Sequence, residues 1–313
     1  MAFTTENTSS PPVEVFALAT GQLHHPDRWL FEDGNEDLMT ARNVYPDYSF
    51  LIRHASGKCI LFDLGLDKNL DNYPEAIKKS FSYTSPIIHE DIVDLLGKGP
   101  VPSSAIDTVI FSHLHFDHVG DCTKFPNAAM ITGPGSCQAA FPGYPTDQNS
   151  PFGGLVLVHP GYRELSFEND SWRPFGPFER AHDFFGDGSL FLVDAPGHAS
   201  GHLGAAARTG PDEWVFMGGD TCHHRAILMG TRPMSLTMGP PDTSCFHRDP
   251  ATAQKTIELI RSIEVTEKFQ VLLAHDSYLS GIMPEYPISL NGWKGSQWKR
   301  NLDALVAKET AAK

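Results

Sequence analysis

The chain has 313 residues, 41% of them hydrophobic, and carries 38 Asp and Glu against 24 Lys and Arg, for a formal net charge of −14. This acidic balance argues against nucleic-acid binding, which rests on Lys and Arg contacts to phosphate. No apolar run approaches the ~18 residues of a membrane span, and residues 1–12 are polar without the features of a secretory signal. We therefore expect a disordered lead over 1–12 and a cytoplasmic protein, in which the five irregularly spaced cysteines stay reduced.

Local patterns predict the first elements in chain order. Residues 13–19 begin with the alternation Val13-Glu14-Val15 and continue as an apolar run, which predicts an opening strand, and a loop over 21–31 follows. Residues 48–54 and 58–62 flank a short turn and predict a β-hairpin. Apolar residues at helical spacing predict a helix over 87–96.

Four further apolar runs each end in a His or an Asp. The runs and the residues that follow them are 107–112 with His113, 189–194 with His198, 214–217 with Asp220 and 269–274 with His275. Binding residues gather in loops at one edge of a scaffold, so we expect these strand ends to meet. Asp249 followed by Pro250 predicts the start of a helix, and residues 296–311 form a second helical pattern. The chain thus shows two successive series of strands and helices, each ending in His or Asp residues, and this order is consistent with two packed sheets that have helices on their outer sides.

The segment from His113 to His118, with the sequence HLHFDH, is the densest group of metal-ligand side chains. Imidazoles and carboxylates suit zinc and its first-row neighbours. In extended backbone, side chains two residues apart point the same way, so His113 and His115 can share one ion. Asp117 and His118 are adjacent and diverge, which suits a second ion. The segment predicts a two-metal hydrolytic site, the alternative being a solvated, His-rich turn.

Five motifs in this order resemble the metallo-β-lactamase superfamily. They are Phe62-Asp63-Leu64-Gly65, the HLHFDH segment, Pro196-Gly197-His198, Gly219-Asp220 and His275. The resemblance implies an α/β fold, an αββα sandwich of two packed mixed β-sheets flanked by helices, as a single domain over 13–313. It also implies a ligand set for two divalent ions, expected to be Zn²⁺: His113, His115 and His198 for the first, Asp117, His118 and His275 for the second, and Asp220 as the bridge. Asp63 would anchor a ligand or its loop by hydrogen bonding.

Within the superfamily the chain resembles the N-acyl-homoserine lactonase branch, in the HLHFDH segment and in the doubled Gly-His of residues 197–202. The resemblance implies a dinuclear zinc hydrolase that opens a small cyclic ester or amide through a metal-bridging hydroxide. Asp117 would shuttle the proton. The lactonases carry a tyrosine three residues after the bridging Asp, where this chain has His223; we expect His223 to polarise the substrate carbonyl, with His224 and Tyr278 as rivals. Some fungal lactamases that open small cyclic carbamates or lactams look similar as well.

Two other activities occur on the implied scaffold. A thioesterase or glyoxalase-type hydrolase would need a basic patch for its carrier, and the sequence has no such run. A non-haem iron oxygenase is the other alternative, although the diiron redox branch usually has Glu where this chain has His115. The expected partner is a small-molecule substrate, without nucleic acid or membrane, and the chain is a possible homodimer.

Two stretches between the ligand motifs, near 161–188 and 227–246, are predicted to be loop insertions. Both are rich in aromatic residues, methionine or proline. Long loops beside a site often form lids or pocket walls, and the alternative is surface packing. Residues 29–31, Trp-Leu-Phe, would join the same apolar wall. Cys222 and His202 lie near the ligand motifs but are not expected to bind a metal.

Overall fold

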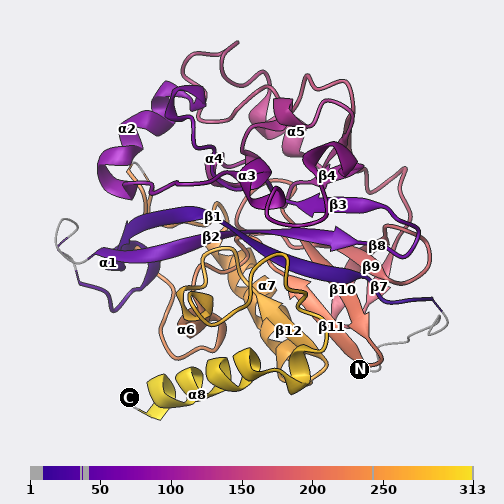
Figure 1. The fold of residues 1–313 in the computed structure, drawn as a ribbon. Helices are drawn as coiled ribbons and strands as arrows, with labels where there is room; N and C mark the ends of the chain where they lie inside the picture. Colours follow the sequence, from indigo (N-terminus) through magenta and orange to yellow (C-terminus); the bar gives the residue numbers. More distant parts are fainter. Residues whose placement is uncertain (1–9, 36, 38–41, 242, 312–313) are drawn as a thin grey trace.

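The computed structural model describes residues 10–35, 37, 42–241 and 243–311. Most of the predicted disordered lead, residues 1–12, lies outside the described residues. Two six-stranded sheets pack face to face, with helices on their outer sides, as Figure 1 shows. This arrangement confirms the predicted αββα sandwich.

The first sheet has the strand order β1-β2-β3-β4-β5-β6. Its strands are β1 (Glu14–Pro26), β2 (Arg42–Arg53), β3 (Cys59–Phe62), β4 (Thr108–Ile110), β5 (Ala129–Thr132) and β6 (Tyr162–Glu164). β1, β2 and β3 are antiparallel neighbours, and β3 to β6 run parallel, so the sheet is mixed. β2 and β3 form the predicted hairpin, with Phe50 paired to Phe62.

The second sheet has the order β12-β11-β10-β9-β8-β7. Its strands are β7 (Trp172–Phe175), β8 (Phe178–Asp183), β9 (Leu190–Asp194), β10 (Leu203–Gly210), β11 (Glu213–Met217) and β12 (Phe269–Leu272). Neighbours are antiparallel except for β11 and β12, which are parallel. The C-terminal ends of β9, β11 and β12 all lead into predicted ligand residues.

Short helices connect the strands. The α-helices are α1 (Asp27–Leu30), α2 (Glu75–Thr84), α3 (Ile92–Leu96), α4 (Phe116–Val119), α5 (Ser136–Ala140), α6 (Arg225–Leu228), α7 (Pro250–Glu264) and α8 (Gln297–Ala311). The 3-10 turns are Leu70–Asn72, Ser103–Ala105, Cys122–Lys124, Ser277–Leu279 and Trp293–Gly295. In Figure 1, α3 and α5 lie on one side of the two sheets, and α6, α7 and α8 lie on the other. Asp249 caps α7 by accepting from Thr252 N, which confirms the predicted helix start.

Strand alternation divides the apolar side chains among three layers. Ile60 and Phe62 of β3 point between the sheets, where they meet Leu192 of β9, while Leu61 points to the opposite face. α3 covers that outer face of the first sheet. On the far side of the second sheet, α7 packs Ile257, Ile260 and Ile263 against Phe216, Trp214 and Val271. The buried layers leave the strand ends as the place where polar side chains collect.

Three local predictions were wrong. β1 does not stop near residue 19: a bulge at Ala19/Gly21 lets it continue to Pro26, and α1 follows, so the predicted loop over 21–31 is mostly strand and helix. The predicted helix over 87–96 begins only at Ile92, because Asp91 and Asp94 form a capping box there and Ile87 pairs with Gln22 instead.

The third correction concerns the predicted loop insertion near 161–188. This stretch contributes β6 to the edge of the first sheet and β7 and β8 to the edge of the second. Its aromatic residues therefore pack on sheet neighbours, as Phe175 does on Phe191 with ring centroids 4.3 Å apart. The stretch near 227–246 contains the end of α6 and, in its described residues, no strand.

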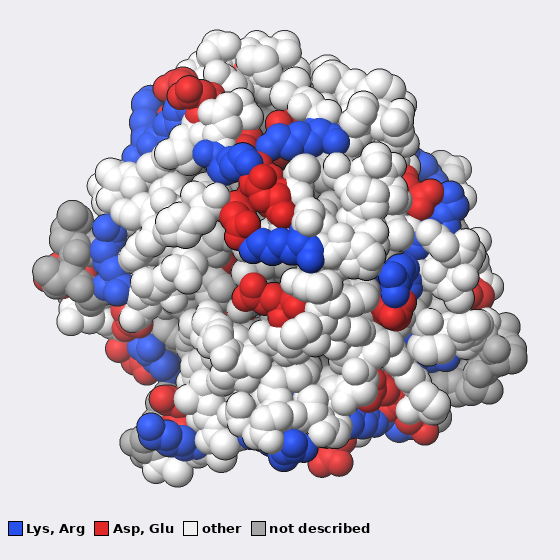
Figure 2. Space-filling view, viewed as in Figure 1, with Lys and Arg blue, Asp and Glu red and all other residues white. Residues whose placement is uncertain are grey.

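Acidic and basic side chains alternate on the visible surface. Figure 2 shows Lys and Arg beside Asp and Glu on this face, where grey covers the residues that are not described. Among the described residues, no helix has both the length and the apolar character that crossing a bilayer requires.

Candidate metal centre

Four strands deliver His and Asp side chains to one buried place. β4 leads to His113, β9 to His198, β11 to Asp220 and β12 to His275, and each of these residues is less than 4% exposed. His115 precedes α4 in extended backbone, and α4 carries Asp117 and His118. All seven predicted ligands therefore lie together, although they come from positions 113 to 275 of the chain.

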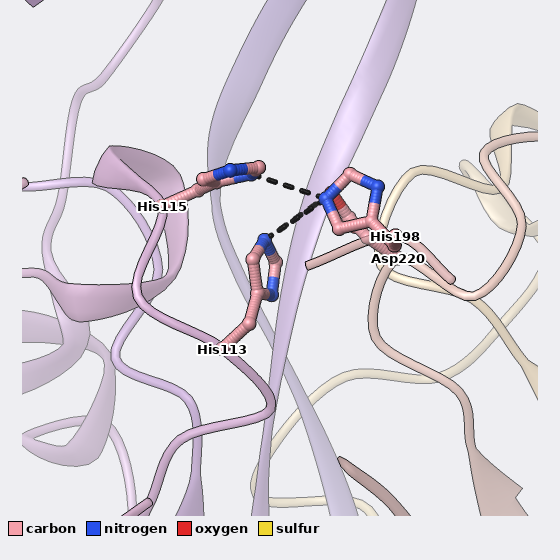
Figure 3. Close-up of side chains that lie close together, drawn as sticks. All are labelled: His113, His115, His198 and Asp220. Atoms are coloured by element: carbon pink, nitrogen blue, oxygen red, sulfur yellow. Dashed lines mark hydrogen bonds and ion pairs between the residues drawn. The ribbon is translucent and has the colours of Figure 1, made fainter. Parts of the chain in front are cut away.

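The first group of ligand atoms surrounds His198, as Figure 3 shows. Nε2 of His198 lies 3.2 Å from Nε2 of His113 and 3.0 Å from Nδ1 of His115. It also lies 3.3 Å from Oδ2 of Asp220. Ligand atoms of these four residues lie within 4.8 Å of one another. Three imidazoles and one carboxylate converge on this point.

The second group faces the other oxygen of Asp220. Oδ1 of Asp220 lies 3.3 Å from Nε2 of His118 and 3.2 Å from Nε2 of His275. Asp117 completes the group, with its Oδ2 3.6 Å from Nε2 of His275. Asp220 thus turns one oxygen to each group, which is the geometry of a bridging carboxylate.

Asp220 is fixed by its backbone. Its N–H donates to Nε2 of His202 at 3.1 Å, so His202 holds the Asp220 loop in place. This hydrogen bond occupies Nε2 of His202, which is therefore not available to bind a metal ion. The preceding Gly219 has a positive φ of 51°, and a Cβ there would lie 2.8 Å from Cβ of Ser112. Glycine is required at this close approach of two ligand loops.

Hydrogen bonds set the ring orientation of three histidines. Asp63, at the end of β3, accepts from Nδ1 of His118 at 2.9 Å and from the Ser112 backbone N–H at 2.6 Å. Nδ1 of His113 lies 3.0 Å from Oγ of Ser112, and Nδ1 of His275 donates to the Pro46 carbonyl at 2.8 Å. Each contact occupies Nδ1 and leaves Nε2 free to bind an ion. The predicted anchoring role of Asp63 is confirmed.

The residues fit divalent metal ions. With metal–nitrogen distances near 2.0–2.1 Å, ligand atoms around a tetrahedral ion lie roughly 3.3 Å apart, close to the spacings in both groups. Nε2 of His118 and Oδ1 of Asp220 are buried without a hydrogen-bond partner among the described residues. Burial of unpaired polar atoms is costly, and a shared cation would satisfy both.

The electrostatics of the cluster also favour cations. Burial holds the pKa of His113 and His198 well below the usual value, so both rings are neutral and able to bind a metal. Burial alone would lower the pKa of His275, but Asp220 and then Asp117 raise it to about 9. The second group is therefore the more anionic of the two.

Two consecutive histidines after Asp220 have different roles. Nε2 of His223 lies 3.2 Å from Oδ2 of Asp220, so His223 faces the centre. His224 turns away: its Nδ1 accepts from Ala226 N and caps α6, and its Nε2 lies 3.2 Å from Oγ of Ser277. Tyr278 packs on the ring of His224, with centroids 5.2 Å apart. Of the three candidates for the carbonyl contact, His223 is the one that contacts a predicted ligand.

Aromatic side chains form one wall of the centre. The ring of Phe246 lies 4.7 Å from that of His223 and 5.2 Å from that of His25, measured between centroids. Trp29 packs on both His25 and Phe246. Phe246 closes the predicted insertion near 227–246, so this end of the insertion forms the expected wall, together with Trp29. Phe31, also predicted there, packs instead on the ring of His224.

Three residues beside the centre were not predicted to lie there: no pattern in the sequence indicated His247 or Asp47, and His25 was expected to be a loop residue. His25 lies in β1 with its ring 6.4 Å from that of His275. His247 is 4% exposed, and its ligand atom lies within 4.8 Å of those of His198 and His223. Asp47 is fully buried and groups in the same way with His118 and His275. None of the three comes directly after an apolar run. The pattern that predicted the other ligands, an apolar run ending in His or Asp, therefore does not indicate them.

Cys222 lies outside the ligand groups. Its Sγ donates to the His224 carbonyl at 3.3 Å, and burial raises the pKa of the thiol to about 12. All five cysteines are free thiols. A small cavity of about 80 Å³ adjoins His115 and His198 and is bordered by Phe152 and Arg248.

Comparison with known proteins agrees with this geometry. The sequence profile of the metallo-beta-lactamase superfamily matches residues 42–265. The chain is 35% identical to the metallo-hydrolase mfmC of Annulohypoxylon moriforme, over 93% of this chain and 85% of that protein. It is 29% identical to the gamma-lactamase FDB1 of Fusarium pseudograminearum, over 81% of this chain and 72% of that protein.

Other relatives are much longer. The chain is 35% identical over 84% of its length to the cytochrome P450 monooxygenase mpaDE′ of Penicillium brevicompactum, but spans only 33% of that protein. Among solved structures, an N-acyl homoserine lactone hydrolase with bound N-hexanoyl-L-homoserine superposes with a TM-score of 0.65 at 17% identity, covering 88% of this chain and 98% of the other. That similarity concerns the fold.

Proposed function

Because the chain belongs to the metallo-β-lactamase superfamily of metal-dependent hydrolases, we propose that it is a dinuclear zinc enzyme that opens a small cyclic amide or ester. The observation that carries the proposal is the position of Asp220, which turns Oδ2 toward His198 and Oδ1 toward His118 and His275. One carboxylate between two imidazole groups is what a bridging ligand requires.

The proposed ligands are those of the sequence analysis. His113, His115 and His198 would hold one ion, Asp117, His118 and His275 the other, and Asp220 both. Two zinc ions bound there would supply a hydroxide at neutral pH and would polarise the substrate carbonyl. Without bound ions, the imidazole of His275 would be protonated and positively charged near neutral pH, since Asp220 and Asp117 raise its pKa to about 9. Metal loading should therefore release protons.

Two side chains of the chain would act on the substrate. Asp117, at the edge of the second group, would carry the proton to the leaving nitrogen or oxygen when the ring opens. His223 would donate from Nε2 to the carbonyl oxygen as negative charge develops on it, in place of the Asp220 contact of 3.2 Å. The aromatic wall of His25, Trp29 and Phe246 would exclude water from the ring of the substrate.

The cyclic amide is the substrate class supported by the relative named a gamma-lactamase. A cyclic ester has the same planar acyl carbon and requires the same attack, with oxygen leaving in place of nitrogen. The charge distribution of Figure 2, with both signs interspersed on the visible face, offers no particular support for a carrier-linked thioester there.

A substrate panel with metal analysis tests the proposal. Untagged protein is loaded with zinc, its metal content is measured by mass spectrometry, and turnover is followed on γ-lactams, lactones and thioesters. We expect two zinc ions per chain and ring opening of lactams or lactones. One ion per chain in fully active protein, or turnover confined to thioesters, would contradict the proposal.

A further inference from the structure

Asp47 is a buried carboxyl group with one unpaired oxygen. Its side chain is fully buried, and its Oδ2 accepts from Oγ1 of Thr20 at 2.5 Å. Its Oδ1 has no hydrogen-bond partner among the described residues. Thr20 is itself held, because its Oγ1 also accepts from Leu66 N at 3.3 Å. A buried carboxyl oxygen left unpaired is costly, so a partner outside the protein atoms is to be expected.

Hydrogen bonds from the backbone on both sides of Asp47 hold it next to the second ligand group. On one side of it, the Pro46 carbonyl accepts from Nδ1 of His275 at 2.8 Å. On the other, Tyr48 N donates to the Ala274 carbonyl at 3.0 Å. Ligand atoms of Asp47, His118 and His275 lie within 4.8 Å of one another. Nε2 of His118 is buried without a hydrogen-bond partner among the described residues as well, so Asp47 and His118 each carry one unsatisfied polar atom.

We propose that Asp47 is a further ligand of the second metal ion, through Oδ1. The inference rests on the proposed two-metal function and changes its second site. The first ion would keep three imidazoles and Asp220, whereas the second would have two imidazoles and three carboxylates, from Asp47, Asp117 and Asp220. Carboxylate oxygens favour harder ions such as Mn²⁺, and imidazole suits zinc. The two sites should therefore prefer different ions, with a Mn²⁺-accepting second site beside a zinc-selective first site.

A rival role for Asp47 is purely structural. Asp47 could stay a neutral acid that holds Thr20 and never contacts an ion. Asparagine has the shape of the neutral acid and can keep the Thr20 contact, but it lacks the anionic oxygen. Asp47→Asn therefore removes the proposed ligand while it preserves the rival role. Asp67 is a matched control, since it is 2% exposed and its carboxylate binds Asn69 N and Asn72 within its own loop.

The experiment measures binding of Mn²⁺ itself. Apoprotein with one equivalent of Zn²⁺ in the first site is titrated with Mn²⁺, and free Mn²⁺ is followed by electron paramagnetic resonance. We expect Asp47→Asn to weaken Mn²⁺ binding about tenfold or more, Asp67→Asn to leave it unchanged, and His275→Ala to abolish it. Bound zinc should stay at one equivalent in the Asp47 and Asp67 variants.

The outcomes separate this inference from the proposed function. Unchanged Mn²⁺ affinity in Asp47→Asn together with loss in His275→Ala would overturn the role of Asp47 and leave the two-metal centre standing. A wild-type chain that binds one ion in total would overturn both. Should Asp47→Asn fail to fold, a crystal structure of the wild-type chain with Mn²⁺ located by its anomalous scattering decides: Oδ1 of Asp47 at coordination distance from the second ion supports the inference, and an oxygen beyond that distance overturns it.

Discussion

Gly197 and Ala253 approach so closely that a Cβ on Gly197 would lie 2.4 Å from Cα of Ala253. The contact presses the loop that carries His198 onto the first turn of α7. Two backbone hydrogen bonds lock it there, from Asp249 N to the Gly197 carbonyl at 2.9 Å and from Arg248 N to the His198 carbonyl at 3.0 Å. The start of α7 therefore positions a proposed metal ligand, and the close approach explains why glycine precedes His198.

The first prediction is that Gly197→Ala destabilises the protein and weakens metal retention. Gly197 has φ 125°, a backbone region that costs an L-residue on the order of 1–3 kcal/mol, and the clash with Ala253 adds about 1–3 kcal/mol of overpacking. Chemical denaturation and metal content measure the two effects. Gly57→Ala is the control, because Gly57 also has a positive φ, of 87°, but a Cβ there meets nothing within 4 Å. Equal losses in both variants would show that the contact with α7 is unimportant.

The second prediction concerns the carbonyl contact. We expect His223→Ala to lower kcat roughly a hundredfold or more, since an oxyanion donor is worth about 2.7–4 kcal/mol, with two metal ions retained. His224→Asn should stay within a few-fold of the wild type, because Asn preserves the cap on α6. If His223→Ala instead loses zinc, its contact with Asp220 is a metal-site contact, and the donor role is wrong.

The third prediction is that Asp117→Asn lowers turnover by orders of magnitude while the melting temperature of the apoprotein stays close to that of the wild type. Asparagine can neither carry the proton nor supply a charged ligand, yet it fits the same space. Asp220→Ala should be worse, because it removes a ligand of both ions. Near-normal turnover in a fully metal-loaded Asp117→Asn protein would remove Asp117 from the mechanism.

The fourth prediction follows from His224, whose pKa burial lowers to about 4. The unfolded chain binds this proton near pH 6.5 and the folded chain does not, so the free energy of unfolding falls as pH drops from about 6.5 toward 4 and is unaffected above that range. For His224 alone the loss at pH 5 is on the order of 2 kcal/mol. His224→Asn keeps the cap but removes the titration. Urea denaturation of the two apoproteins at pH 7 and pH 5 should show a smaller pH effect in the variant; parallel losses would contradict the assignment.

The sequence predicted the ligands that follow apolar strands, because each is fixed by a local pattern. His113, His198, Asp220 and His275 end such strands, and the strands have to bury their apolar faces between the sheets. Asp63 was predictable for the same reason, at the end of β3. Once the strands form two packed sheets, their ends lie at the same edge, so the architecture alone brings these ligands together.

The remaining features depend on contacts between distant segments. Asp47 lies beside His275 because β2 runs along the end of β12. No sequence pattern near residue 47 predicts this contact. His25 reaches the centre only because a bulge lets β1 continue past Gly21. The helix predicted over 87–96 failed where a capping box and a pairing with Gln22 outweighed apolar spacing.

The division of the ligands between the sheets has a mechanical consequence. His113 to His118 follow the first sheet, whereas His198, Asp220 and His275 follow the second. Each group combines side chains from both, so bound ions would cross-link the halves of the sandwich at one edge, in a chain whose cysteines are all free thiols. A ligand that binds only the folded state adds RT ln(1 + [L]/Kd) to the free energy of unfolding. Here the bound ions would stabilise the contact between the two sheets. Chelation should therefore loosen the two halves relative to each other before it melts either one.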